Sequence, residues 1–303
     1  MKSIMSFVTS MVIFGTIGAV VRFIELPSCE IALYRGLIGV FCLFPFLLFN
    51  NRKGLARDFV ANSLVLFLSG VALAGNWILL FEAYRNTTIA IAALCYYTAP
   101  VIVMALSPLI LKEKVSIFKV LCIGVTLFGM ILVVRVDHNF HGSYNHFLGI
   151  VFGISAAICY ATLMILNKFI KQLDGLETTV PQLFLAALIL FPYVLLTGAL
   201  KPIIHVDRSL MLLIVLGLVH TGIGFLLFFI GLQGLKAQRI AILSYLDPLT
   251  SVMISLFIFG EHMTFIQIAG AFLICGATLA GTVNWTLPKW MTKEFKPVPF
   301  CGE

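Results

Sequence analysis

Long apolar runs alternate with short polar connections along almost the whole chain. The apolar runs lie at 4–24, 30–49, 59–83, 88–110, 115–135, 147–169, 179–198, 209–232, 238–259 and 263–285. A helix needs about 20 apolar residues to cross the hydrocarbon core of a bilayer. The pattern therefore predicts an all-α integral membrane protein with ten transmembrane helices, followed by a flexible cytoplasmic tail at 287–303.

The second half of the chain repeats the first. An offset of 147 or 148 residues aligns Tyr97 with Tyr245, Pro100 with Pro248, Glu113 with Glu261, Pro45 with Pro192 and Glu30 with Glu177. The predicted repeats are 1–138 and 147–286. Because each repeat holds five spans, an odd number, the second must enter the membrane from the opposite side to the first. The sequence thus predicts a 5+5 inverted repeat, an arrangement typical of transporters.

Composition and charge support the membrane assignment. Apolar residues make up 61% of the chain and charged residues only 11%, which is unlike a soluble globular domain. Most of the 20 lysine and arginine residues fall on one side of the predicted spans. By the positive-inside rule, both termini are expected in the cytoplasm. The seven cysteines lie mostly in apolar runs without metal-binding spacing, so we expect small buried hydrophobic residues.

Two prolines lie inside the fourth and ninth predicted spans. A proline within a helix lacks the N–H donor and clashes with the carbonyl four residues earlier. Pro100 therefore releases the carbonyl of Tyr96, and Pro248 that of Ser244. In lipid, a released carbonyl is tolerated where it faces protein or a water-filled cavity. We expect two pseudo-symmetric kinks facing a transport pathway; a role in packing alone is the alternative.

The order of these motifs resembles the EamA type of drug/metabolite transporter. Each half has a proline-bearing helix, a short charged cap and a glycine-rich last helix. The matching segments are Ala99-Pro100 with Lys112-Glu113, Leu246-Asp247-Pro248 with Gly260-Glu261, Phe14-Gly15-Thr16, Tyr34-Arg35-Gly36 and Ala83-Tyr84-Arg85-Asn86-Thr87. The sequence departs from the family pattern at Lys112, where the cap usually has glycine, and at Phe14, where tryptophan is frequent. The resemblance implies a ten-helix secondary carrier with a central cavity lined mainly by the first four helices of each half.

These features predict a gradient-driven transporter that works by alternating access in the cytoplasmic membrane. We expect a small-molecule substrate, an amino acid or related amphipathic compound, moved by export, with coupling to a proton or another ion. A non-transporting membrane sensor or scaffold is the alternative. The chain lacks HExxH, GxSxG and phosphate-loop motifs, so no enzymatic activity, cofactor, metal or nucleic-acid partner is expected. Small residues in the last run permit either a homodimer or packing on the fifth run.

Asp247 is the strongest candidate for substrate binding or proton coupling. An acidic side chain within a span costs about 2.5–3.5 kcal/mol on insertion scales and marks a functional site by default. Bracing of the kinked helix is the alternative role. Ser244 lies three residues before Asp247 and Ser251 four residues after it, so the three share one helical face, whereas the position equivalent to Ser244 in the first half is Tyr96. One polar and one aromatic wall suit an amphipathic substrate.

Further polar and aromatic residues complete the predicted lining. They are Tyr96, Tyr97, Tyr245, Asn76, Trp77 and Tyr160. His220, in the eighth run, is either a packing histidine or a proton-linked one. Arg35 is expected to pair with Glu30, with binding of a substrate carboxylate as the alternative. Glu82 and Arg85, three residues apart, are expected to form an interfacial ion pair rather than a gate.

The charged caps and a histidine-bearing loop have simpler interpretations. Glu113 and Glu261 are expected to be local helix caps or local ion pairs, with only a minor gating role. His138, His141 and His146 lie near Asp137 in the connection between the repeats, and a hydrated loop is favoured over a weak metal site.

Overall fold

The protein is an all-helical bundle in the computed structural model. The structure describes residues 2–21, 23–49, 54–87, 89–113, 115–133, 145–197, 208–258, 264–282 and 294–295. When the segments of interrupted helices are joined, these residues form ten helices. Six of these helices are long and apolar enough to cross a membrane by length and composition. The large exposed side chains fit that setting, since Phe41, Phe49, Phe147 and Phe265 are each more than two thirds exposed on an apolar outer surface.

The first repeat begins with an interrupted helix and ends with a shorter one. Its elements are α1 (Lys2–Gly15), α2 (Ile17–Val21), α3 (Ser28–Phe49), α4 (Leu55–Asn86), α5 (Ile89–Tyr96), α6 (Ala99–Ile110), β1 (Val115–Ser116) and α7 (Ile117–Val133). The turn between α1 and α2 is at Thr16, whose hydroxyl donates to the carbonyl of Ile13 at 2.7 Å. Such a bond offers the backbone an alternative to the regular helical ladder.

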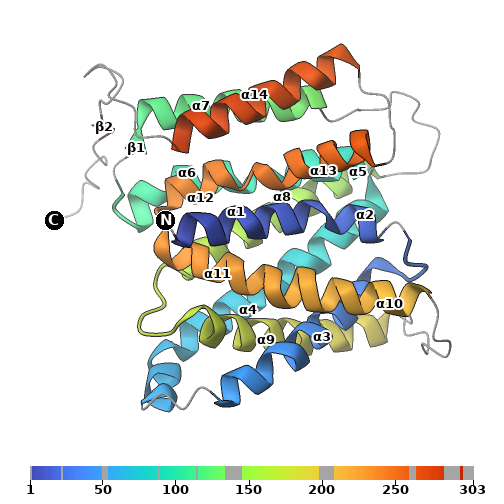
Figure 1. Cartoon of the computed structure of the whole chain (residues 1–303), viewed down its shortest axis with the longest axis vertical. Coiled ribbons are helices and arrows are strands. Elements are labelled where there is room, and N and C mark those ends of the chain that lie inside the picture. Colours follow the sequence, from blue (N-terminus) through green and yellow to red (C-terminus); the bar gives the residue numbers. More distant parts are fainter. Residues whose placement is uncertain are drawn as a thin grey trace.

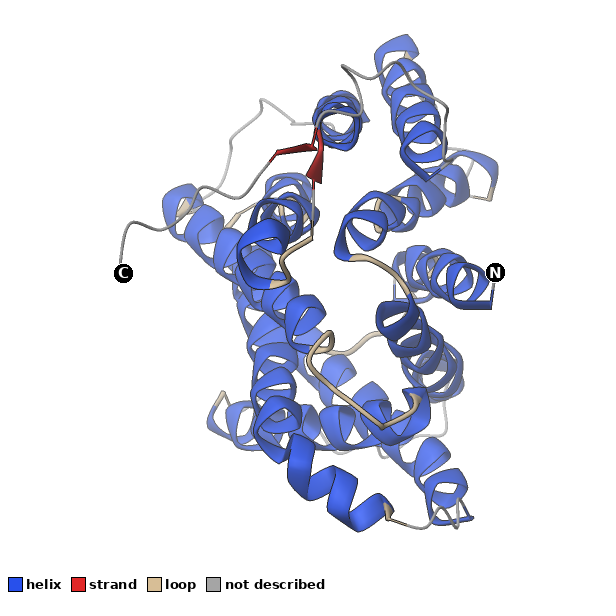
Figure 2. Cartoon of the chain, turned by 90° about the vertical axis from the view of Figure 1, so that its left-hand side faces the viewer, coloured by secondary structure: helices blue, strands red, loops and turns tan. Residues whose placement is uncertain are grey.

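The second repeat follows the same plan. Its elements are α8 (His146–Leu166), α9 (Gly175–Leu196), α10 (Arg208–Val215), the π-helix η1 (Leu216–Ile223), α11 (Gly224–Gly234), α12 (Ala237–Leu243), α13 (Leu246–Phe257) and α14 (Phe265–Thr282). Two residues of the predicted tail form β2 (Glu294–Phe295), which pairs antiparallel with β1 and is drawn in red in Figure 2. The rest of that tail lies outside the described residues.

Both proline-bearing spans are broken rather than gently kinked. The fourth span divides into α5 and α6 and the ninth into α12 and α13, each with a short turn just before its proline. Pro100 has no N–H, and the next amide, of Val101, donates to Thr98 instead of Tyr97. The carbonyl of Tyr97 is therefore free to accept a bond from another part of the molecule.

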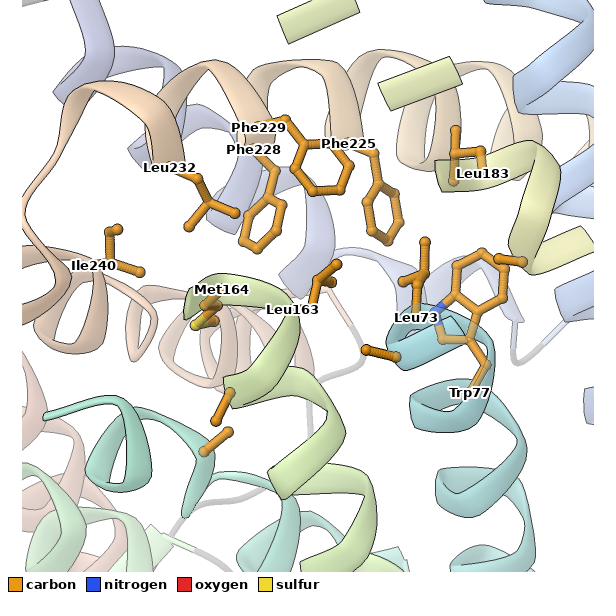
Figure 3. Close-up of a cluster of buried hydrophobic side chains, with 14 of the residues drawn as sticks. Leu73, Trp77, Leu163, Met164, Leu183, Phe225, Phe228, Phe229, Leu232 and Ile240 are labelled. Atoms are coloured by element: carbon orange, nitrogen blue, oxygen red, sulfur yellow. The ribbon is translucent and has the colours of Figure 1, made fainter. Parts of the chain in front are cut away.

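The helices of the two repeats interleave around one core. α1 of the first repeat packs against α11 and α13, and its counterpart α8 packs against α4 and α6. Phe225, Phe228 and Phe229 of α11 point toward α8 and α4 in the close-up of Figure 3. The last helices α7 and α14 pack on each other at one edge of the bundle (Figure 1). The first four helices of each repeat thus surround the middle of the molecule.

Candidate functional site

The breaks in the fourth and ninth spans meet each other. The hydroxyl of Tyr245 donates to the carbonyl of Tyr97 at 3.2 Å. These two residues occupy equivalent positions in the repeats, 148 residues apart. Tyr245 is fully buried, so this bond satisfies a carbonyl that the proline break leaves unpaired. The two interruptions are therefore joined at the centre of the bundle.

A column of aromatic rings lies beside this junction. Tyr96 stacks on Tyr160 with ring centroids 5.3 Å apart and an interplanar angle of 13°. Tyr160 in turn stacks on Phe228, at 6.0 Å and 16°. Tyr96 and Tyr160 both keep part of their surface accessible, whereas Phe228 is buried. The rings come from α5, α8 and α11, so both repeats build this wall.

Arg35 of α3 extends the wall with a positive charge. Its guanidinium carbon lies 4.6 Å from the centroid of the Trp77 ring, a cation–π geometry. Its Nε atom is buried without a hydrogen-bond partner, and its charge interacts with Tyr84 and Tyr96. The sequence favoured pairing with Glu30, but the guanidinium of Arg35 makes no ion pair with a described residue.

Asp247 supplies a negative charge from the other repeat. It lies in the first turn of α13, where the helix dipole favours an anion. Its side chain is partly exposed, and its carboxylate has no hydrogen bond or ion pair to any described residue. It interacts electrostatically with Tyr84, Tyr96 and others of the tyrosine group. Arg35 and Asp247 therefore act electrostatically on the same tyrosines, Tyr84 and Tyr96, without forming an ion pair with each other.

Several predicted lining residues are occupied by structural bonds. Asn76 is buried and donates to the carbonyl of Ala156 at 2.9 Å. The Ser244 hydroxyl donates to its own helix, to the carbonyl of Ile240 at 2.8 Å. Ser251 lies on the exposed surface of α13.

His220 lies in η1, a π-helix, and such segments are frequent at functional sites. Its Nε2 atom lies 2.7 Å from the hydroxyl of Thr16. That hydroxyl has one hydrogen, which it donates to Ile13, so Nε2 must be the donor to Thr16. The ring is buried and interacts with the charge of Arg35. His220 thus supports the break between α1 and α2 next to the arginine.

The remaining charged residues lie at the ends of the helices. Arg85 Nη1 is 3.0 Å from Glu82 Oε1, so the pair expected from the i,i+3 spacing is present, and the Tyr193 hydroxyl also donates to Glu82. Glu30 is completely buried. Glu113 is not the local cap that the sequence suggested, because its Oε1 accepts from the amide of Ala237 in the other repeat at 3.1 Å.

Some residues singled out in the sequence lie outside the part of the chain that the structure describes. Glu261, His138, His141 and Asp137 lie outside the described residues. His146 bonds Thr87 through Nδ1 at 2.9 Å. Within the described part of the chain, no group of three or more metal-ligating side chains comes together.

Sequence reasoning missed Tyr84 as a site residue. Its hydroxyl interacts electrostatically with both Arg35 and Asp247, as does that of Tyr96. The signal was present, since Tyr84 follows Trp77 by seven residues and so lies on the same face of α4. The sequence pattern at this helix end instead indicated Arg85, which is spaced to pair with Glu82.

Comparison with known proteins agrees with this architecture. The model of the EamA-like transporter family matches residues 1–135 and 147–283. An uncharacterized transporter of Archaeoglobus fulgidus is 30% identical over 275 residues, which cover 90% of this chain and 94% of that protein. A probable amino-acid metabolite efflux pump of Salmonella typhimurium is 25% identical over 252 residues, 80% of this chain and 82% of that protein. A crystal structure with 16% identity superposes with a TM-score of 0.80 over 93% of this chain and 96% of its own, which shows a shared fold.

Proposed function

The chain belongs to the EamA-like transporter family, and we propose that it moves a small zwitterionic metabolite across the cytoplasmic membrane by alternating access. The single observation that carries this proposal is that Arg35, whose buried Nε atom has no hydrogen-bond partner, and Asp247 both lack an ion-pair partner among the described residues while both act electrostatically on Tyr84 and Tyr96. An intramembrane charge is costly, and such residues normally pair with one another or mark a substrate or ion pathway. Here the missing partner of each charge is the substrate.

The chemistry of the site suggests how an amino acid would bind. The planar guanidinium of Arg35 suits a carboxylate, which it can bind through two parallel hydrogen bonds. The carboxylate of Asp247 suits an ammonium group. An apolar or aromatic substrate side chain would contact the rings of Tyr96 and Tyr160, which are stacked and partly accessible. This is the substrate class named for the Salmonella relative, an amino-acid metabolite.

The repeat supplies the proposed mechanism. Arg35 belongs to the first repeat and Asp247 to the second, so the substrate would lie at the interface of the repeats. The two repeats are proposed to be inverted, with both termini in the cytoplasm, and to rock around the bound substrate. The direction proposed is export. The energy is proposed to come from a gradient of substrate, proton or another ion, with Asp247 as the group that carries a coupled proton.

The test compares metabolites inside and outside cells that express wild type, Asp247→Asn, Arg35→Gln or an empty vector, at matched membrane levels. Glu25→Gln serves as the charge control, because Glu25 is exposed in the connection between α2 and α3. A zwitterion exported by wild type and Glu25→Gln, but by neither site variant, is the expected result. If the transported compound lacked an amino or a carboxyl group, the assigned roles of Arg35 and Asp247 would be wrong. Identical metabolite profiles for wild type and vector, in export and in uptake, would favour the sensor or scaffold alternative.

A separate measurement addresses coupling. With the identified substrate in liposomes, wild type is expected to show transport driven by a pH gradient, and Asp247→Asn to retain exchange without that dependence. Unchanged pH dependence in the variant would remove Asp247 from the proton pathway while leaving its role in substrate binding open to the first test.

A further inference from the structure

The two broken spans contact each other at one end only. α6 packs against α12, the two segments that lead to the lysine-rich end of the molecule with Lys112, Lys168 and Lys236. By repeat symmetry, the counterparts of α6 and α12 are α13 and α5. Among the described residues α5 packs instead against α8, and α13 against α1 and α14, without a comparable contact between them. The fourth and ninth spans are therefore in contact at the lysine-rich end and separated from each other at the opposite end.

Glu113 holds the closed end across the repeat boundary. Its Oε1 accepts from the amide of Ala237, the first residue of α12, at 3.1 Å. The first amides of a helix have no partner within the helix, and the helix dipole favours an anion there. Lys236, the N-cap residue of α12, supplies no side-chain cap of its own. The cap of this helix in the second repeat therefore comes from the first repeat.

The backbone before Glu113 is turned so that the carboxylate reaches α12. Lys112 has a φ of 53°, in the left-handed region, directly after α6. The amide of Glu113 then donates to the carbonyl of Ser107 at 3.3 Å, which fixes the turn to the end of α6. A non-glycine residue in this conformation is uncommon and costs energy. This strained turn directs the Glu113 side chain toward α12 of the second repeat.

Two lysines reinforce the same contact. The ammonium of Lys168, just after α8, donates to the carbonyls of Leu232 and Leu235 at the end of α11. Lys168 also interacts electrostatically with Glu113. Lys119 of α7 donates to the side chain of Gln238 at 3.0 Å, a second bond from the first repeat to α12. The turn between α11 and α12 is thus held by a cation on one side and by an anion on the other.

We propose that Glu113 stabilises the closed state of the gate at the lysine-rich end, and that its hydrogen bond to the Ala237 amide must break whenever that end opens. The proposal rests on alternating access as the mechanism, since only a protein with a second, mirror-related state needs to separate α6 from α12. In that state water would replace the Glu113 carboxylate as the hydrogen-bond partner of the Ala237 amide. Removing the carboxylate should therefore shift the population toward the state open at the lysine-rich end.

The test is hydrogen–deuterium exchange by mass spectrometry on the full chain in lipid nanodiscs. Glu113→Ala is expected to raise exchange about tenfold or more in peptides from α12 and the end of α6, because a bond to a charged group is lost. Peptides from α5 and α13 are expected to become more protected as the opposite end closes. Glu113→Gln, which keeps an acceptor oxygen but not the charge, is expected to give a smaller change in the same directions.

Matched controls separate a gate from a local cap. Glu25→Gln and Lys171→Met should both exchange as wild type, because both side chains are exposed. Faster exchange confined to α12, without added protection of α5 and α13, would show that Glu113 is only a structural cap and would overturn the proposal. Unchanged exchange in Glu113→Ala would overturn it as well. This readout needs no substrate, so it can succeed or fail independently of the metabolite comparison.

Discussion

Replacing Gly15 by alanine tests the closest helix contact near the proposed site. A Cβ atom at Gly15 would lie 2.5 Å from Thr250 Cβ and 2.6 Å from the carbonyl oxygen of Asp247. The second neighbour is backbone and cannot rotate away, so α1 must move from α13. Overpacking of this kind costs about 1–3 kcal/mol. Against this stands the gain from helix propensity, since alanine is favoured over glycine in a helix by about 1 kcal/mol.

Gly18 is a matched control only three residues away. A Cβ at Gly18 meets no atom within 4 Å, so Gly18→Ala should gain the propensity term without any clash. We expect Gly18→Ala to stabilise the protein slightly and Gly15→Ala to destabilise it by up to about 2 kcal/mol. The measurement is the unfolding midpoint in detergent, followed by a thiol-reactive dye that reports exposure of the buried Cys122 and of the partly buried cysteines. Equal midpoints for the two variants would refute the close approach of α1 to α13.

Three other predictions follow from single contacts. Tyr245→Phe should lower the free energy of unfolding by about 1 kcal/mol, since it removes the hydrogen bond to the partly buried Tyr97 carbonyl; an unchanged unfolding midpoint would contradict the bond. Lys112→Gly should raise that free energy, because glycine adopts φ 53° without the cost of about 1–2 kcal/mol paid by other residues, and a lower midpoint would count against the strained turn. Burial lowers the pKa of Lys168 from 10.5 to about 8, with nearby Glu113 opposing part of this change. The unfolded chain then binds more protons between pH 8 and 10.5, so stability should rise with pH in this window relative to Lys168→Met; parallel midpoints for both proteins from pH 7 to 10 would show that Lys168 is not buried.

Features that depend on nearby residues were predictable from the sequence. The breaks before Pro100 and Pro248 follow from the missing N–H of each proline, which no tertiary contact can restore. The Glu82–Arg85 pair follows from one turn of helix. The fourth apolar run, 88–110, agrees with α5 and α6 together, while α4 extends a turn beyond the predicted 59–83 at its start, because helices continue past the apolar core.

Features that depend on how the repeats pack were beyond the sequence. Arg35 was expected to pair with Glu30, five residues away, yet its guanidinium lies over Trp77 of another helix. Glu113 was expected to act locally, yet it caps a helix more than a hundred residues later in the chain. Tyr84 belongs to the site because α4 brings its hydroxyl within electrostatic reach of both Arg35 and Asp247. A side chain with several rotatable bonds can reach many partners, and only the packed helices decide among them.

The sequence by itself determined that the chain is a duplicated membrane protein with two proline breaks at equivalent positions, because hydropathy, repeat offset and the chemistry of proline are properties of the chain alone. The tertiary structure decided that the two breaks meet through Tyr245 and Tyr97, and that Arg35 and Asp247 act on the same tyrosines without an ion-pair partner among the described residues. It also decided that the two broken spans touch at the lysine-rich end. These are relations between helices. The repeat pattern by itself does not determine at which end the fourth and ninth spans contact each other. That choice depends on which caps and ion contacts the packing brings together.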